Sequence, residues 1–231
     1  LKCFNRATEL SAFEFFSDLA LQKVRTHRGL SAPLASAEEN YALLEFDEED
    51  MAAVERAFET CVQEGWVTDG VISQSEAQAQ GLWSLREGIS ESLAPYTPYK
   101  NDLSVRVSDV PAFLQDVDRY VTGSYPDFEV CWYGHIGDGN LHLNILRPDH
   151  LSVEEFFHHG HAMSPRIFEL VAKRGGSISA EHGVGLLKRD FLSYSRSDEE
   201  IEYMRGLKAL FDPDQILNPH KLIPANAIVK S

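Results

Sequence analysis

Two glycine-rich runs contain residues whose types and spacing suit metal chemistry. Residues 133–144 read Tyr-Gly-His-Ile-Gly-Asp-Gly-Asn-Leu-His-Leu-Asn, and residues 175–185 read Gly-Gly-Ser-Ile-Ser-Ala-Glu-His-Gly-Val-Gly. The first run predicts a hairpin that turns at residues 137–140, because glycine accepts positive φ and Asp and Asn tolerate it. In that register His135 faces His142, with Cβ atoms roughly 4.5–5.5 Å apart. Two imidazoles at this separation can bind one metal ion.

The second run adds Glu181 and His182. Adjacent residues in extended backbone point to opposite sides, so we expect one to bind the metal and the other to face a reacting atom. Two histidines and one carboxylate leave coordination positions open for water or substrate, and such a centre polarises a bound oxygen. Zinc suits this ligand set, and iron and manganese also accept it. The chain contains neither the dinucleotide-binding nor the phosphate-binding glycine motif.

Two cations, Arg86 and Lys100, lie on either side of Pro95. Arg binds carboxylates through two nitrogens and Lys supplies a compact charge, so the pair could receive an anionic substrate. The alternative is ordinary solvation, or an ion pair with Glu87 or Asp102. The residues alone leave both interpretations open.

Composition limits the possible partners. The chain has 231 residues, 36 Asp and Glu against 21 Lys and Arg, and a net charge of −15. This balance argues against nucleic acid or anionic lipid, which require a basic surface. Cys3, Cys61 and Cys131 are odd in number and widely spaced, which predicts buried free thiols in a reducing compartment. No apolar run approaches the roughly 18 residues of a membrane span.

The elements that must position these residues follow from periodicity and breaker residues. The order of strands and helices predicts one α+β unit with an antiparallel or mixed sheet covered by helices. Besides the hairpin, we expect strands over residues 41–46, 67–72 and 102–107, and helices over 12–24, 51–64, 74–93, 108–122, 152–173 and 198–211. Asp212-Pro213-Asp214 ends the last helix, and the two prolines of residues 216–224 predict an extended tail.

Both glycine-rich runs, together with Leu217-Asn-Pro-His-Lys221, resemble the C-terminal half of FAD-linked 2-hydroxyacid dehydrogenases of the vanillyl-alcohol-oxidase type. The resemblance extends from Glu9 to nearly the end of the chain, and its histidine-containing motifs are long and specific. The runs Leu82-Trp-Ser-Leu-Arg-Glu87, Tyr99-Lys-Asn-Asp-Leu-Ser104 and the twelve residues from Ser179 are most similar to the branch that oxidises D-2-hydroxyglutarate.

The resemblance implies a fold, a reaction and a set of site residues. The fold is the FAD-linked oxidase C-terminal domain with ferredoxin-like elements, and the reaction oxidises a D-2-hydroxyacid to the 2-oxoacid by hydride transfer to FAD. The implied residues are His135, His142 and Glu181 for a divalent metal, commonly zinc; His182 as the base that removes the hydroxyl proton; Arg86, Ser90, Lys100, Asn144 and His182 for substrate; and Asn218 near the flavin.

The sequence departs from the family pattern in three respects. Ser90 stands where the hydroxyglutarate branch commonly has Thr, and His220 replaces the glycine of the commoner Asn-Pro-Gly-Lys tail. The family's N-terminal FAD-binding domain is absent from this chain. We therefore expect residues 1–231 to form the substrate- and metal-binding domain, with the tail 212–231 packing toward the flavin domain. The chain alone should bind metal without turning over.

Other functions and partners remain as alternatives. The substrate could be D-lactate or glycolate, and the same ligand set would also suit a zinc-dependent hydrolase or a non-catalytic metal-binding module. The resemblance implies an electron-transfer flavoprotein or a quinone as electron acceptor and allows a homodimer. Cysteine usage fits either the bacterial cytoplasm or the mitochondrial matrix.

Overall fold

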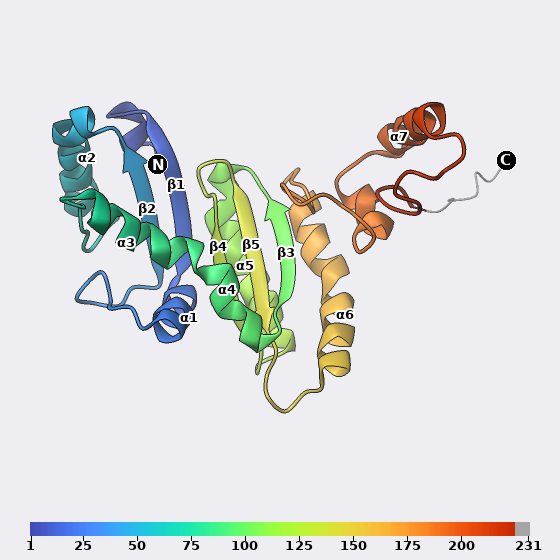
Figure 1. Ribbon diagram of the computed structural model, residues 1–231, viewed down its shortest axis with the longest axis horizontal. Coiled ribbons are helices and arrows are strands. Elements are labelled where there is room, and N and C mark those ends of the chain that lie inside the picture. Colours follow the sequence, from blue (N-terminus) through green and yellow to red (C-terminus); the bar gives the residue numbers. More distant parts are fainter. Residues whose placement is uncertain (225–231) are drawn as a thin grey trace.

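A computed structural model describes residues 1–224 of the chain (Figure 1). The strands are β1 (Leu10–Ser17), β2 (Asn40–Phe46), β3 (Tyr99–Ser104), β4 (Glu129–Gly134) and β5 (Asn140–Leu146). The α-helices are α1 (Asp18–Arg28), α2 (Met51–Gln63), α3 (Glu76–Glu87), α4 (Ile89–Leu93), α5 (Val110–Ser124), α6 (Val153–Ala172) and α7 (Asp198–Phe211). Short 3-10 helices cover Phe4–Arg6, Glu48–Asp50, Ala94–Tyr96, Val107–Asp109 and Arg189–Tyr194.

The five strands form one sheet in the order β2-β1-β4-β5-β3, and every neighbouring pair is antiparallel. The predicted α+β class is therefore confirmed, and the sheet is antiparallel and not mixed. Strand β1 joins β4 through only two paired positions, Phe15 with Gly134 and Phe16 with Tyr133. Strands β1 and β2 consequently diverge from the other three (Figure 1).

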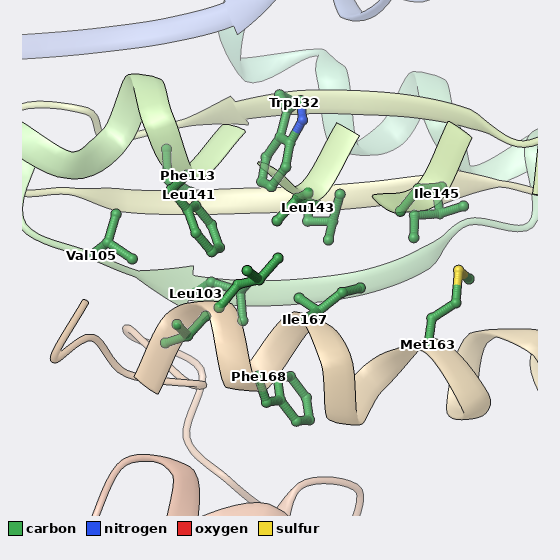
Figure 2. Packing of buried hydrophobic residues seen from close by; sticks show 14 of the residues in the cluster. Leu103, Val105, Phe113, Trp132, Leu141, Leu143, Ile145, Met163, Ile167 and Phe168 are labelled. Atoms are coloured by element: carbon green, nitrogen blue, oxygen red, sulfur yellow. The ribbon is translucent and has the colours of Figure 1, made fainter. Parts of the chain in front are cut away.

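The two faces of the sheet have different chemistry because side chains alternate along each strand. One face carries Leu103, Trp132, Leu143 and Ile145, which pack against helices α5 and α6 in the main core (Figure 2). The opposite face carries Lys100 and Asp102 of β3 and His142 and Asn144 of β5. Helices α1, α3 and α4 cover part of that face through a second apolar cluster. A polar site can therefore lie directly behind the main core.

Three sequence predictions for the N-terminal half differ from the structure. The predicted helix at residues 12–24 is β1 followed by α1. Strand β1 lies between two other strands and buries Phe15 and Phe16 on opposite faces. Its apolar residues therefore do not alternate with polar ones. Their spacing also fits a helical period, which is why the sequence predicted a helix. No strand forms over 67–72 in the described structure, where Val71 is exposed and unpaired with the sheet. The predicted helix 74–93 is divided into α3 and α4 at Gly88.

The helices around the C-terminal half agree with the sequence. Ser152 caps α6 through a capping box with Glu155, and Ser197 caps α7 in the same way with Glu200. Helix α2 also lies where it was predicted. Among residues 1–224, no helix is both long enough and apolar enough to cross a membrane.

Candidate metal centre

The β4–β5 hairpin has a register that differs from the predicted one. Tyr133 lies opposite His142 and Cys131 lies opposite Asn144, so the predicted pairing of His135 with His142 is wrong. His135 instead belongs to the loop that follows β4. The register differs by two residues, and an even shift keeps each side chain on the same face. The His135 and His142 rings therefore still approach each other, with centroids 5.6 Å apart.

Glycine and aspartate shape the loop that carries His135. Gly139 has φ of 81°, and a Cβ atom at this position would lie 2.0 Å from the carbonyl oxygen of Val105. The Asp138 carboxylate accepts a hydrogen bond from the Asn140 amide at 3.0 Å, which closes the turn. Only glycine combines this backbone conformation with so close an approach. The loop is thus held against the end of β3.

His135, His142 and Glu181 form a cluster with the arrangement expected of metal ligands. One ligand atom from each residue lies within 4.8 Å of the others. His142 Nε2 is 3.4 Å from Glu181 Oε1. Ligands of tetrahedral zinc, each about 2.0–2.1 Å from the metal, lie roughly 3.3 Å apart. His142 and Glu181 already have that spacing, and the longest separation in the cluster, up to 4.8 Å, would shorten when these three side chains hold a small divalent cation.

The electrostatic environment keeps His142 neutral. Burial lowers the pKa of His142 to about 4, against the opposing attraction of the Asp102 carboxylate, and the charge of Arg86 lowers it further. A neutral imidazole has a free lone pair at neutral pH, and metal binding requires this form. Strand β5 therefore presents a histidine that needs no deprotonation before it binds a metal.

Asp102 on β3 fixes the segment that carries Glu181 and His182. Its Oδ2 atom accepts hydrogen bonds from the backbone amides of both residues, each at 2.9 Å. Although burial opposes the charge, these two amides hold the pKa of Asp102 below its ordinary value. Lys188 donates to the backbone carbonyls of Asp102 and Ile178 at 3.0 and 2.5 Å. The loop is therefore anchored at two points.

The prediction that Glu181 and His182 face opposite sides was wrong. Glu181 Oε1 lies 3.4 Å from His142 Nε2 and 3.5 Å from His182 Nε2, so both side chains reach the same cluster. The segment is a bend and not a strand, and strand alternation does not apply to it. The His182 ring stacks beside His142 with centroids 5.6 Å apart. Its side chain is 65% exposed, so it can meet an incoming molecule.

Arg86 enters the polar face from α3. It is buried and its Nη2 atom pairs with Glu14 Oε2 of β1 at 2.8 Å. Its guanidinium carbon lies 5.0 Å from the centre of the Tyr133 ring. Neither partner considered from the sequence, Glu87 or Asp102, forms this ion pair. The arginine is thus fixed beside the histidine cluster.

Lys100 and Asn144 lie on the polar face next to Asp102 and His142 in the β3–β5 pairing, and Ser90 contacts Lys100. Lys100 lies opposite Asn144 in the β3–β5 pairing and donates a hydrogen bond to the Ser90 hydroxyl at 3.3 Å. Lys100 and Ser90 are both exposed. Asn144 is buried, and its Oδ1 atom has no hydrogen-bond partner among the described residues. Buried polar atoms are usually paired, so this oxygen is available to a ligand.

Asn218 is not brought to the cluster. Its described polar contacts are with Lys221 in the segment after α7, which Figure 1 shows away from the sheet. His220, which replaces the glycine of the commoner tail motif, has φ of 62° and so keeps a backbone conformation that glycine favours. Of the predicted tail 212–231, residues 225–231 lie outside the described residues.

Sequence reasoning missed two acidic residues of the site, Glu14 and Asp102. Both are buried, and both contact histidines of the cluster. Each stands inside a strand that also carries buried apolar residues, and a charged residue at such a position is rare unless it is paired. That signal could have identified Asp102 in its alternating strand. Glu14 was hidden because β1 was predicted to be helical.

Comparison with known proteins places the chain in a family. Residues 2–222 match the family described as FAD linked oxidases, C-terminal domain, and the chain belongs to that family. It is 55% identical over 228 residues to a protein named D-2-hydroxyglutarate dehydrogenase from Stutzerimonas stutzeri (strain A1501). The aligned region covers 97% of the chain and 49% of the relative. A protein of the same name from Xanthomonas citri pv. viticola is 52% identical over 222 residues, which covers 95% of the chain and 47% of the relative.

A more distant relative is named D-2-hydroxyglutarate dehydrogenase, mitochondrial, from Danio rerio. It is 37% identical over 226 residues, covering 94% of the chain and 40% of the relative. The family predicted from the motifs is confirmed, and the names of these relatives agree with the predicted branch. The chain spans about half the length of the bacterial relatives that it matches.

Proposed function

We propose that this chain is the substrate- and metal-binding part of an FAD-dependent dehydrogenase that oxidises D-2-hydroxyglutarate, or a related D-2-hydroxyacid, to the 2-oxoacid. The observation that carries the proposal is the position of His182, which lies beside the His135–His142–Glu181 cluster and is exposed. Membership of the FAD-linked oxidases and the names of the relatives support the same reaction. The cluster by itself would also suit a hydrolase, and the family favours the redox reaction.

His182 is proposed as the base that takes the proton from the substrate hydroxyl. When bound, the metal supplies positive charge that makes a neighbouring hydroxyl more acidic, and the flavin supplies the acceptor for the hydride from C2. His182 Nε2 lies near Glu181 and His182 Nδ1 lies 3.9 Å from Asp102 Oδ2. Because Glu181 is assigned to the metal, Asp102 is the carboxylate proposed to stabilise the imidazolium that forms when the base takes the proton. His135, His142 and Glu181 would hold the metal, and zinc suits these ligands.

The cations of the polar face are proposed to bind the substrate carboxylates. Lys100 and Ser90 are exposed and in contact with each other, while Arg86 and His142 both lie beside the Tyr133 ring. Asn144 Oδ1 can accept a hydrogen bond from the substrate. Two separate cations suit a dicarboxylate better than a monocarboxylate. Equal kcat/KM for D-2-hydroxyglutarate and D-lactate in the longer protein would contradict this part of the proposal.

The remainder of the relatives' length is proposed to provide the flavin-binding domain. Helix α7 exposes an apolar face formed by Tyr203, Leu207, Leu210 and Phe211. It lies apart from the sheet (Figure 1), and the exposed Ile216 and Leu217 follow it. A surface of this kind marks an interaction site. We assign α7 and the tail 212–231 to the contact with the flavin domain, with Asn218 near the flavin. The thiols support a reducing compartment, bacterial cytoplasm or mitochondrial matrix.

Two substitutions test the division of roles between ligand and base. His142→Ala should reduce the zinc content of the purified chain sharply, because it removes one of three ligands. His182→Ala should keep the zinc content and abolish turnover in the longer protein that contains this chain. Elemental analysis and anaerobic flavin reduction by D-2-hydroxyglutarate measure the two effects. An equal loss of zinc in both variants would show that the assignment is wrong.

The chain alone should bind metal but should not turn over. A purified chain with stoichiometric yellow flavin would contradict the assignment of the flavin to another domain. Metal-dependent cleavage of esters or amides, without flavin bleaching, would favour the hydrolase in its place.

A further inference from the structure

Glu14 is a buried carboxylate that the proposed reaction does not use. It lies on β1 between Phe13 and Phe15, and its side chain is 6% exposed. Its two oxygens face different partners. Oε1 is 2.8 Å from His135 Nδ1, and Oε2 is 2.8 Å from Arg86 Nη2. One carboxylate therefore touches both a candidate metal ligand and a candidate substrate cation.

The burial of Glu14 is costly without these partners. An ionised carboxylate in an apolar environment requires a paired charge and hydrogen bonds to offset its lost hydration. Arg86 supplies the charge, and it is itself buried. The contact with His135 is not needed to neutralise Glu14, so its main effect is on the histidine.

His135 depends on that contact for its orientation. Its side chain is 43% exposed and stands on a loop, whereas the side chain of His142 is 9% exposed and is held by packing within the sheet. An exposed imidazole on a turn can rotate unless a hydrogen bond restrains it. A carboxylate that accepts the Nδ1 proton also selects the tautomer whose Nε2 lone pair is free for a metal.

We propose that Glu14 is a positioning residue that fixes the orientation and tautomer of His135 and holds Arg86 in place at the same time. This inference rests on the proposed metal centre and adds a residue behind it. Arg86 also lies against the Tyr133 ring, which lies against His142 with centroids 4.9 Å apart. Glu14 thereby closes a ring of contacts through His135, His142, Tyr133 and Arg86.

The test uses the 231-residue chain and zinc ion in competition with a chelator of known affinity. Glu14→Gln should lower the zinc affinity by roughly 10- to 100-fold, the usual effect of removing a residue that orients a metal ligand. In the metal-free chain, nitrogen-15 NMR should show Nδ1-protonated His135 in the unsubstituted protein and a tautomer mixture in the variant. Glu129→Gln is the control for the same substitution at an exposed strand glutamate that pairs with Lys23 at 3.2 Å.

A folding defect would not obscure the result. If Glu14→Gln does not fold, the double variant Glu14→Gln/Arg86→Met also removes the guanidinium that lost its partner, and the zinc affinity is measured there. Zinc affinity within about threefold of the unsubstituted chain, or an unchanged His135 tautomer, would overturn the role of Glu14. If the unsubstituted chain binds no zinc but His135 keeps its Nδ1 proton, the proposed metal centre is wrong. The proposed role of Glu14 in orienting a metal ligand is then wrong as well.

Discussion

Replacement of Asp102 by Asn tests how the site is assembled. The Asp102 carboxylate accepts two backbone hydrogen bonds, from the amides of Glu181 and His182. A hydrogen bond to a charged group contributes about 1.5–3 kcal/mol to stability and a neutral one about 0.5–1.5 kcal/mol. Asn keeps the shape and loses the charge, so the variant should lose about 2 kcal/mol. For a chain of 231 residues this lowers Tm by roughly 4–8 °C.

The pH dependence of this loss follows from the pKa of Asp102, which the folded protein holds below its ordinary value of 3.8. The stability that the charged group contributes is fully present above pH 3.8 and is lost as the pH falls through the lower folded pKa. Urea unfolding of the Asp102→Asn variant should therefore show the full deficit at pH 7. The deficit should shrink as the pH falls below about 3.8, because the unfolded chain then binds the Asp102 proton more readily than the folded protein does, and it should vanish below the folded pKa.

Asp118→Asn is the matched control, and we expect it to have the opposite effect on stability at pH 7. Asp118 accepts a hydrogen bond from the Trp132 indole at 2.7 Å, and burial raises its pKa above the ordinary value despite that bond. A raised pKa means that the charged form destabilises the fold, increasingly as the pH rises from 3.8 through the folded pKa. The Asn variant should therefore equal or exceed the unsubstituted protein in stability at pH 7. Equal effects of the two substitutions at pH 7 would refute the reasoning.

Three further predictions concern backbone, thiol and surface. Gly139→Ala should lower the free energy of unfolding by at least about 2 kcal/mol, because Gly139 has positive φ and an added Cβ would clash with a carbonyl oxygen. Gly81→Ala should raise it by about 0.5–1 kcal/mol, because Gly81 lies within α3 and an added Cβ would have no neighbour inside 4 Å. Urea unfolding measures both effects. Burial raises the pKa of Cys131 to about 12, so a thiol reagent at pH 8 should label it only after unfolding. Leu187→Ser with Phe211→Ser should reduce self-association in light scattering without changing Tm, since these side chains are 81% and 77% exposed.

Local signals predicted the elements that depend on local chemistry. Helices α6 and α7 lie where they were predicted, and the structure shows a capping box at the start of each, at Ser152 and at Ser197, which requires only residues within one turn. Periodicity failed for β1, where burial on both faces removes the alternation of polar and apolar residues. It also predicted a strand at 67–72, where no partner strand is present in the described structure. Strand pairing depends on residues that are distant in sequence, so a single run cannot specify it.

The hairpin register also shows the difference between what local signals predict and what strand pairing decides. The glycine-rich turn predicted that His135 and His142 share one face, and this is correct although the pairing was displaced by two residues. Strand alternation has a period of two, so an even displacement leaves the face unchanged. The error would have separated the two histidines if the displacement had been odd.

The amino-acid sequence by itself determined the kinds of side chain available, the family to which the chain belongs, and which histidines share a face. Only the tertiary structure decided that Glu181 and His182 both reach the cluster, that Asp102 anchors them, and that Glu14 pairs Arg86 with His135. These contacts join residues up to 121 positions apart in the chain. Their geometry is set by sheet order and by loops that pack across it, and neither is encoded in the spacing of any one motif.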